Sequence, residues 1–539
     1  MTAKKMGLAL AACAAMMATA TADVVAASVA ADTLEEWVDR FNADDDEVYT
    51  NAIPNSAAKA FLAANVPRFD CPDAEIERAY FFRWWTYRKH IKSTPDGYVI
   101  TEFLPPVGWA GKHNTISCAT GHHVMEGRWL RDGRYVDEYV RFMLTQGRVA
   151  EKGAYVFYPA AVLLERRKVT GDKAFVAGLL PDLVRVHDAW RRGWDAPLWP
   201  QRTPMHIGRT PSGLYLMIDN YEGMEYSIGG SGYRPYLNAA MYAEAKALAL
   251  FMEEKGDASA AAAYEKEAAE LADGIRTRLW NPERSFFTVV TTNGEHKAVR
   301  ELTGYTPWLF GVPVPRSCEV AFRHLLDQRG FLAPYGLTVP EQCDPAFRLS
   351  YDGHSCLWDG PVWPYATSLA LTALVNRLHE SHDLDGVTPA DFAMLLHQYA
   401  AAQKRVLPDG RSVSWIDENQ HPYSGDWIAR SVNLARNRGQ VKMRERGKDY
   451  NHSTFCDLVI TGLAGLVPSD GDEFAVDPLV PPTWRRFSLE NVRYHGHDIT
   501  VRWDADGTAY GKGAGLSVFV DGRLTAHSAE ICRLKVSLP

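Results

Sequence analysis

Between about Asp70 and Val467, the sequence reads as helices that recur in pairs, separated by long loops rich in aromatic residues. In the clearest pair, apolar residues from Leu237 to Met252 share one helical face, Gly256 ends that helix, and an Ala- and Glu-rich helix follows from Ala258 to Leu279. Further helical runs are expected near Val136–Leu144, Ala160–Arg167, Leu180–Trp190, Val320–Leu326, Tyr365–Leu378 and Thr388–Tyr399. This organisation predicts a mainly α domain over residues 71–470, with polar and aromatic residues gathered in the segments between helices.

The ends of the chain differ from this body. From Ile499 to Trp503 and from Leu516 to Val520, apolar residues alternate with other residues, and Asp506-Gly507 supplies a turn between the two runs. Residues 471–539 are therefore predicted to form a small β appendage. Residues 23–70 are expected to form an N-terminal arm, either solvated or as a short helix that leads into the main domain. The acidic run Asp44–Glu47 is expected to be a solvated surface.

The first 22 residues have the pattern of a targeting segment. Two lysines precede an apolar run from Met6 to Ala20, and Ala20-Thr21-Ala22 has the small-x-small form of a signal-peptidase site. Cleavage there predicts a periplasmic or extracellular protein and changes the formal net charge from −8 to −10, because two lysines and no acids are removed. Leu10-Ala11-Ala12-Cys13 leaves open a lipoprotein anchored through Cys13. No other segment has the ~18 uninterrupted apolar residues of a membrane helix.

Composition excludes several classes of protein. The chain has 58 Lys and Arg against 66 Asp and Glu, so no basic surplus indicates a nucleic-acid partner. The cysteines are widely spaced and lack the close pairs of a zinc site, and the sequence indicates neither a metal nor an organic cofactor. Aromatic residues make up 11% of the chain, which suits both a large core and the faces of sugars.

Two loop segments in the first part of the chain could bind a substrate. Arg83 and Trp85 lie in Arg-Trp-Trp-Thr-Tyr-Arg, which could stack on a sugar and hold a hydroxyl or carboxylate, although a buried ion pair and core packing explain it equally well. His123 and Arg128 lie in Gly-His-His-Val-Met-Glu-Gly-Arg-Trp. Its order is not the His-Glu-x-x-His of zinc proteases, which argues against a metal site.

A third, Gly-rich segment precedes the strongest predicted helix and contains three acids, Asp219, Glu222 and Glu225, followed by Tyr233 and Arg234. A general acid at neutral pH needs a carboxyl group with a raised pKa, and a loop close to aromatic groups can supply the necessary desolvation. The segment is not a phosphate-binding loop, because it lacks the Gly-Lys-Ser/Thr ending. A capping or cation-binding role for Asp219 remains an alternative.

Two further segments lie downstream. Trp358-Asp359-Gly360-Pro361-Val362-Trp363-Pro364 is a turn whose two tryptophans suit a sugar platform. Beyond it, Asp417 and Glu418 lie between Trp415 and Trp427, and His452 follows in Asp-Tyr-Asn-His. An acid in this region could be the second carboxylate of a glycosidase, opposite the first and with room for a water molecule.

Three of these stretches, in the same chain order, resemble the six-hairpin (α/α)6-barrel glycoside hydrolases of the trehalase, family 63 α-glucosidase and mannosylglycerate hydrolase group. Gly223–Ser227 is similar to the group's Gly-Trp-Asp-Phe-Ser or Gly-Met-Asp-Asn-Ser segment, and Trp358–Pro364 to its Trp-Arg-Gly-Pro-x-Trp turn. Glu418, with Pro422–Gly425, is similar to the Glu-x-Tyr-x-Pro-x-x-Gly stretch that bears the catalytic base. The resemblance covers roughly Ile76–Leu466.

The resemblance implies an (α/α)6 toroid and an inverting mechanism, with Glu225 as acid and Glu418 as base and the carboxyl groups about 6.5 to 9.5 Å apart. Asp219 and Glu222 are reserves for the acid, and Asp417 for the base. This sequence has Glu225 where the group has an Asp, Asp359 where it has an Arg, and Gln420 where it has a Tyr. The resemblance therefore does not identify the substrate of this protein. Candidate substrate-binding residues are Arg83, Trp85, His123, Arg128, Tyr233, Arg234, Trp358, Asp359, Trp363, Trp427 and His452.

The expected function is hydrolysis of a terminal glycosidic bond of an oligo- or polysaccharide, because a deep aromatic barrel mouth favours exo action. One alternative is a furanosidase of the β-L-arabinofuranosidase kind, although its zinc-cysteine version needs clustered thiolates. Another is a polysaccharide lyase that uses the Asp449–His452 stretch. A third is a glycan-binding protein that has lost its chemistry.

Overall fold

The computed structural model describes residues 33–149, 154–198, 203–349, 354–436 and 445–539. The expected leader, residues 1–22, and Cys13 lie outside the described residues. Within those ranges, every helix is too short or too polar to cross a bilayer.

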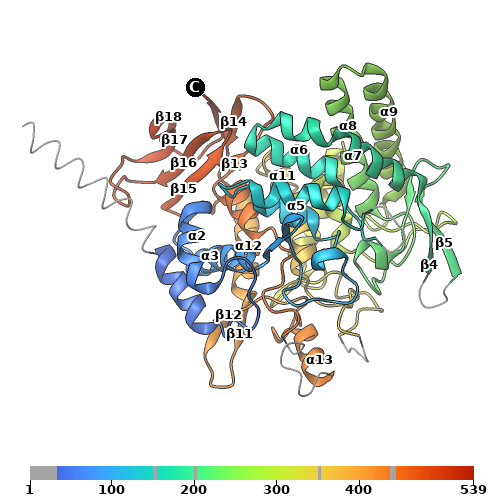
Figure 1. Cartoon of the computed structure of the whole chain (residues 1–539), viewed down its shortest axis with the longest axis horizontal. Helices are drawn as coiled ribbons and strands as arrows, with labels where there is room; N and C mark the ends of the chain where they lie inside the picture. The colour runs from blue at the N-terminus through green and yellow to red at the C-terminus, as the bar shows by residue number, and fades with distance from the viewer. Residues whose placement is uncertain (1–32, 150–153, 199–202, 350–353, 437–444) are drawn as a thin grey trace, which may run out of the picture.

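Helices make up the body of the protein (Figure 1). After a helix at residues 33–44, the α-helices are α2 (Ala58–Asn65), α3 (Ala74–Lys89), α4 (Thr120–Gly127), α5 (Arg134–Thr145), α6 (Pro159–Thr170), α7 (Lys173–Arg192), α8 (Pro235–Lys255), α9 (Ala258–Gly274), α10 (Thr306–Leu309), α11 (Pro364–Leu378), α12 (Pro389–Ala402), α13 (Ile428–Arg436) and α15 (Phe455–Asp457). Two π-helical turns, η4 (Ile275–Leu279) and η7 (Leu458–Leu463), extend α9 and α15, and the longest 3-10 segment is η6 (Arg316–Leu326).

The helix pair expected from Leu237 to Leu279 is confirmed as α8 and α9, which project together from the body (Figure 1). Pro235 opens α8 at a position where its missing N–H is not needed, and Gly256 ends it in the left-handed conformation, with φ 85°. Asp257 then caps α9 by accepting a hydrogen bond from Ala260 N. The other predicted helical runs are found in α5, α6, α7, η6, α11 and α12.

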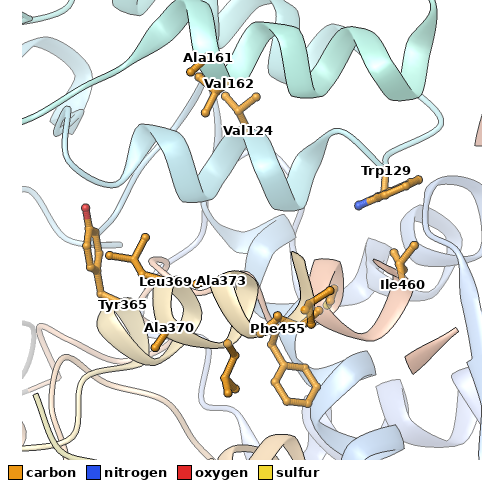
Figure 2. Close-up of a cluster of buried hydrophobic side chains, with 14 of the residues drawn as sticks. Val124, Trp129, Ala161, Val162, Tyr365, Leu369, Ala370, Ala373, Phe455 and Ile460 are labelled. Carbon is orange, nitrogen blue, oxygen red and sulfur yellow. The ribbon is translucent and has the colours of Figure 1, made fainter. Parts of the chain in front are cut away.

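The helices form the predicted toroid, and the last of them closes it. The short α15 packs on α3 and α4, while α12 packs on α3 and α11. Apolar side chains fill the space between α4, α6, α11 and the α15–η7 segment, including Val124, Val162, Leu369 and Phe455 (Figure 2).

Glu126 holds the closure from inside the ring. Its carboxyl oxygens accept hydrogen bonds from the backbone N–H groups of Cys456 (2.9 Å) and Asp457 (2.8 Å), at the start of α15. Asp457 in turn accepts from Arg128 Nη2 (2.8 Å) and Trp129 Nε1 (2.7 Å). These groups are all buried, so the first N–H groups of the last helix are satisfied by a side chain of α4 rather than by water.

A sheet of five strands covers one side of the toroid, in the order β1-β15-β16-β17-β18 (Figure 1). The strands are β1 (Arg68–Asp70), β15 (Arg486–Tyr494), β16 (His497–Asp504), β17 (Gly515–Val520) and β18 (Arg523–Ser528), and a second sheet is formed by β13 (Leu466–Val467), β14 (Glu473–Val476) and β19 (Leu534–Ser537). The alternating patterns around Ile499 and Leu516 are confirmed as β16 and β17. Strand β1 was not expected: it pairs antiparallel with β15, Phe69 opposite Leu489.

Short two- and three-stranded sheets lie in the loops of the body. Their strands are β2 (Ile91–Thr94), β3 (Gly97–Ile100), β4 (Trp194–Leu198), β5 (Thr203–Arg209), β6 (Tyr215–Leu216), β7 (Trp280–Asn281), β8 (Phe286–Phe287), β9 (Leu332–Ala333), β10 (Gly336–Leu337), β11 (Lys404–Val406) and β12 (Ser412–Ser414). They give the loops between helices a fixed backbone.

The expectation that Asp44–Glu47 is a solvated surface is wrong for Asp45. Its carboxylate is buried and forms ion pairs with Lys89 (2.9 Å) and Lys448 (2.5 Å). These two cations hold the pKa of Asp45 well below its usual value in spite of burial. The sequence shows that the four acids are adjacent, but not which of them forms ion pairs with lysines that lie far away in the chain.

Replacing Glu126 with Ala is expected to lower the free energy of unfolding by about 2–4 kcal/mol, because two buried N–H groups would lose their acceptor. Denaturant unfolding of the purified protein measures the change. Glu265→Ala is the control, since Glu265 forms an exposed ion pair with Lys246 and its removal should cost less than about 0.5 kcal/mol. Equal losses in the two variants would contradict a closing role for Glu126.

Candidate active site

One cavity, about 270 Å³ in volume, lies where the loops that precede four helices meet. Cys118 precedes α4, Glu225 precedes α8, Trp358 and Trp363 precede α11, and His452 precedes α15. Side chains from segments far apart in sequence therefore reach the same end of the toroid.

Glu225 enters the cavity from a tight loop. Gly223 and Tyr226 on either side of it both have left-handed backbone conformations, with φ 82° and 63°. For Tyr226 such a conformation is strained, and strain of this kind is commonly stored where a neighbouring group must be aimed. The Cys356 thiol donates a hydrogen bond to Glu225 Oε2 (3.0 Å). Burial raises the pKa of Glu225 to about 7.

Glu418 reaches the same cavity from an extended segment. Antiparallel bridges join Gln420 to Val362 and to Trp427, which fixes the backbone after the acid. The Glu418 side chain is buried and forms an ion pair with Arg446. Arg446 also donates from Nη2 to Ser355 Oγ (3.1 Å), so the cation is held in place as well.

A third acid, Glu102, lines the cavity and was not among the predicted site residues. Its Oε1 accepts a hydrogen bond from the Tyr450 hydroxyl (2.5 Å), and its backbone oxygen accepts one from Asn451 N (3.1 Å). Burial raises the pKa of Glu102 to about 8, and the charges of Glu418 and Glu225 add to the rise. In sequence, the sole signal was an acid between two aromatic segments.

Aromatic residues form one wall of the cavity. The rings of Trp358 and Trp363 stack with centroids 4.0 Å apart, and the His452 ring lies 5.8 Å from Trp363. Burial holds the pKa of His452 well below its usual value, so this imidazole is neutral in the cavity. The structure thus brings together five predicted site residues: Glu225, Glu418, Trp358, Trp363 and His452.

The expectation that the first two segments are loops is wrong: Arg83 and Trp85 lie within α3, and His123 lies within α4, behind the cavity wall. Trp85 packs among aromatic rings and donates from Nε1 to Asn42 Oδ1 (2.9 Å). His123 bonds the backbone oxygen of Asn451 (2.6 Å) and Arg83 the side chain of Asn451 (3.4 Å). Arg128 pairs with Asp457 in the ring closure. Arg83, His123 and Arg128 thus support residues 450–457, whereas Trp85 packs against the helix at residues 33–44. All four side chains lie outside the cavity lining.

Most of the acid-rich segment before α8 is also occupied by internal contacts. Glu222 is fully buried in an ion pair with Arg234 and accepts from Leu237 N (3.0 Å), which holds the start of α8. Asp219 accepts from Ser231 Oγ (3.2 Å), and Tyr233 pairs with Val290 in a β-bridge. These residues do not line the cavity that contains Glu225.

Three remaining candidates brace loops in the same way. Asp417 accepts a hydrogen bond from Glu418 N (2.8 Å), and burial raises the pKa of Asp417 to about 7. Asp359 pairs with Arg348, and Trp427 donates from Nε1 to Lys404 O (2.9 Å). All three lie outside the cavity lining. Among the described residues, no group of three or more His, Cys, Asp or Glu side chains could hold a metal ion.

Two family models match the chain, one after the other along the sequence. Residues 112–453 match the mannosylglycerate hydrolase MGH1-like glycoside hydrolase domain, and residues 468–526 match the C-terminal domain of glycosyl hydrolase family 65. The first match covers the helices from α4 to α13 and most of the residues that line the cavity, and the second covers most of the strands at the C-terminal end.

Solved structures include similar folds. One described as a sialidase is 35% identical, with a TM-score of 0.83, over 94% of this chain; the chain spans 45% of the length of that structure. A mannosylglycerate hydrolase of family 63 from Thermus thermophilus, solved with Tris, is 12% identical with a TM-score of 0.49, over 71% of this chain and 100% of its own. On the strength of the match over residues 112–453, the chain belongs to the MGH1-like glycoside hydrolase family.

Proposed function

We propose that this protein is an exported glycoside hydrolase that removes a terminal sugar with inversion, with Glu225 as general acid and Glu418 as general base. The observation that carries the proposal is the pair of carboxyl groups in one cavity with different surroundings. Glu225 has a raised pKa and a thiol partner, whereas Glu418 forms an ion pair with Arg446. Such a difference is what acid and base roles require.

In the proposed reaction, Glu225 gives its proton to the oxygen of the leaving group as the glycosidic bond breaks. Glu418 takes a proton from a water molecule, whose oxygen bonds to the anomeric carbon from the opposite face. The products are a sugar of inverted configuration and a free alcohol, and a proton returns from Glu418 to Glu225 through solvent. The stacked Trp358 and Trp363 offer a surface for the sugar ring.

The size of the cavity supports exo action. Its volume of about 270 Å³ lies just below the range of about 300–1,000 Å³ typical of pockets for drug-sized ligands. A single sugar ring suits such a space better than the middle of a polysaccharide chain. The names of the similar proteins refer to a sialidase and a mannosylglycerate hydrolase, so they support a glycoside as substrate without selecting the sugar.

Export is the second part of the proposal and rests on the sequence of residues 1–22. Cleavage after Ala22 would release the mature chain, and cleavage before Cys13 would leave a lipid-anchored one. Mass spectrometry of the protein isolated from its native host distinguishes the two by the first residue of the chain.

Glu225→Gln and Glu418→Gln are each expected to lower kcat by at least about 100-fold, because each removes a proton-transfer group. Proton NMR of the mature protein acting on plant and microbial oligosaccharides measures both the rate and the anomer released first. Glu244→Gln is the matched control: Glu244 is buried, its pKa is raised to about 8, and it lies outside the cavity. This variant should keep wild-type activity.

Other outcomes of that experiment would replace the proposal. A product of retained configuration, or full activity in either variant, would contradict the assigned roles. An unsaturated product would indicate a lyase that uses Tyr450 and His452, both of which line the cavity. Sugar binding without turnover, unchanged in both variants, would indicate a glycan-binding protein.

The activity is expected to fall as pH rises through about 7, because Glu225 must hold a proton to act as the acid and its pKa is raised to about 7. Below this pKa Glu225 holds its proton and supports the rate; above it the proton is lost. The decrease therefore lies on the alkaline side of the pH profile of kcat/KM. A profile that stays flat to well above this pH would contradict the assignment of Glu225.

Glu102 is expected to act without ionising. Its pKa of about 8 keeps the carboxyl group protonated and uncharged at neutral pH. The amide of glutamine is also uncharged and has a similar shape. Glu102→Gln should therefore keep kcat/KM within about 3-fold at neutral pH, whereas Glu102→Ala should lower it by about 10- to 100-fold, because the Tyr450 hydroxyl in the cavity wall would lose its acceptor. If Glu102→Gln were as inactive as Glu225→Gln, Glu102 would be one of the two proton-transfer groups.

A further inference from the structure

Residues 355 and 356 form a short bridge between the two sides of the cavity. Ser355 Oγ accepts a hydrogen bond from Arg446 Nη2 (3.1 Å), the same nitrogen that pairs with Glu418. On the other side, the Cys356 thiol donates to Glu225 Oε2 (3.0 Å). Two adjacent side chains therefore contact the groups on which both proton transfers depend.

The backbone around Cys356 is fixed against the same acid. Trp358 N donates to the backbone oxygen of Glu225 (3.1 Å), and Asn419 Nδ2 donates to Ser355 O (2.9 Å). The stacked Trp358 and Trp363, with Trp363 Nε1 donating to Leu357 O (2.9 Å), hold the turn that follows. The thiol is thus aimed at the carboxyl group by a constrained backbone.

Resting on the proposed function, we infer that Cys356 is a positioning residue for the acid: its S–H bond to Oε2 leaves Oε1 to carry the proton and stabilises the carboxylate that forms when the proton leaves. A thiol is a weak donor, but its bond strengthens as negative charge develops on the acceptor. An interaction that is stronger in the transition state than before it increases kcat rather than substrate binding.

The direction of the effect on pH dependence follows from the same bond. A donor to the ionised form lowers the pKa of a carboxyl group, so loss of the thiol raises the pKa of Glu225 further above its usual value. Other charged or titratable groups also face this acid or the same cavity, and they stay in place when the thiol is removed: Glu102, Cys118, Tyr155, Asp219, His354, Tyr365, Glu418, Arg436, Arg446, Tyr450 and His452.

The chain supplies a matched control. Cys118 is a second thiol that lines the same cavity, and it lies beside Gly223. The thiol that hydrogen-bonds Glu225 is Cys356. Substitution of either cysteine removes one thiol from the cavity, but only the change at Cys356 removes that bond to the acid.

The test is the pH profile of kcat and KM, on the oligosaccharide that wild type cleaves, for Cys356→Ala, Cys356→Ser and Cys118→Ala. Cys356→Ala should lower kcat by about 3- to 10-fold, leave KM unchanged and move the alkaline midpoint to higher pH. Cys356→Ser, whose hydroxyl is a stronger donor, should keep the midpoint at or below that of wild type. Cys118→Ala should leave the midpoint where it is.

An unmoved midpoint in Cys356→Ala, or an equal shift in Cys118→Ala, would overturn the inference. If Cys356→Ala does not fold, Cys356→Ser decides alone, since a shift to higher pH in that variant would contradict a donor role. Failure of the proposed function is distinguishable, because Glu225→Gln would then keep its activity. If Glu225→Gln is inactive and the alkaline midpoint is the same in Cys356→Ala and Cys118→Ala, the assignment of Glu225 as acid holds and the positioning role of Cys356 is contradicted.

Discussion

The structure depends on how carboxyl groups are accommodated when they are removed from water. A buried carboxylate is costly unless it is paired, hydrogen-bonded or protonated, and this protein buries several within its ring of helices. Glu126 accepts two backbone N–H groups, Glu418 pairs with Arg446, and Glu102 receives the Tyr450 hydroxyl. Glu225 accepts a hydrogen bond from the Cys356 thiol. Each acid is stabilised differently, and such a difference is what the roles proposed for Glu225 and Glu418 require.

Backbone contacts between distant loops bring these acids together. Val362 bridges to Gln420, Trp358 N bonds the backbone of Glu225, and Asn451 N bonds that of Glu102. Because the loops are tied to one another as well as to their helices, the carboxyl groups are held in fixed relative positions. Such preorganisation is what allows fixed groups to stabilise charge as it develops during a reaction.

Sequence patterns predicted most of the longer helices, two of the strands and two of the three acids that line the cavity, because periodicity and motif order are local properties. They missed α3 and α4, whose polar and aromatic residues were expected in loops. They did not distinguish the side chains that line the cavity from those that support it. Arg83, Trp85 and His123 lie in segments as polar and aromatic as the loop of Glu225, but their partners, such as Asn42 and Asn451, are distant in sequence. Glu102 was missed for the same reason, since Tyr450 lies 348 residues away.

The pairing of β1 with β15 has a consequence for the order of folding. The strand Arg68–Asp70 leaves the early part of the chain and forms an edge of a sheet whose other strands lie after residue 485. Because Phe69 pairs with Leu489, the sheet cannot be completed until nearly the whole chain has been made. Contacts of such long sequence separation form slowly. During synthesis from the N-terminus, this early strand therefore stays without its partner strand until the last segment of the chain has been made.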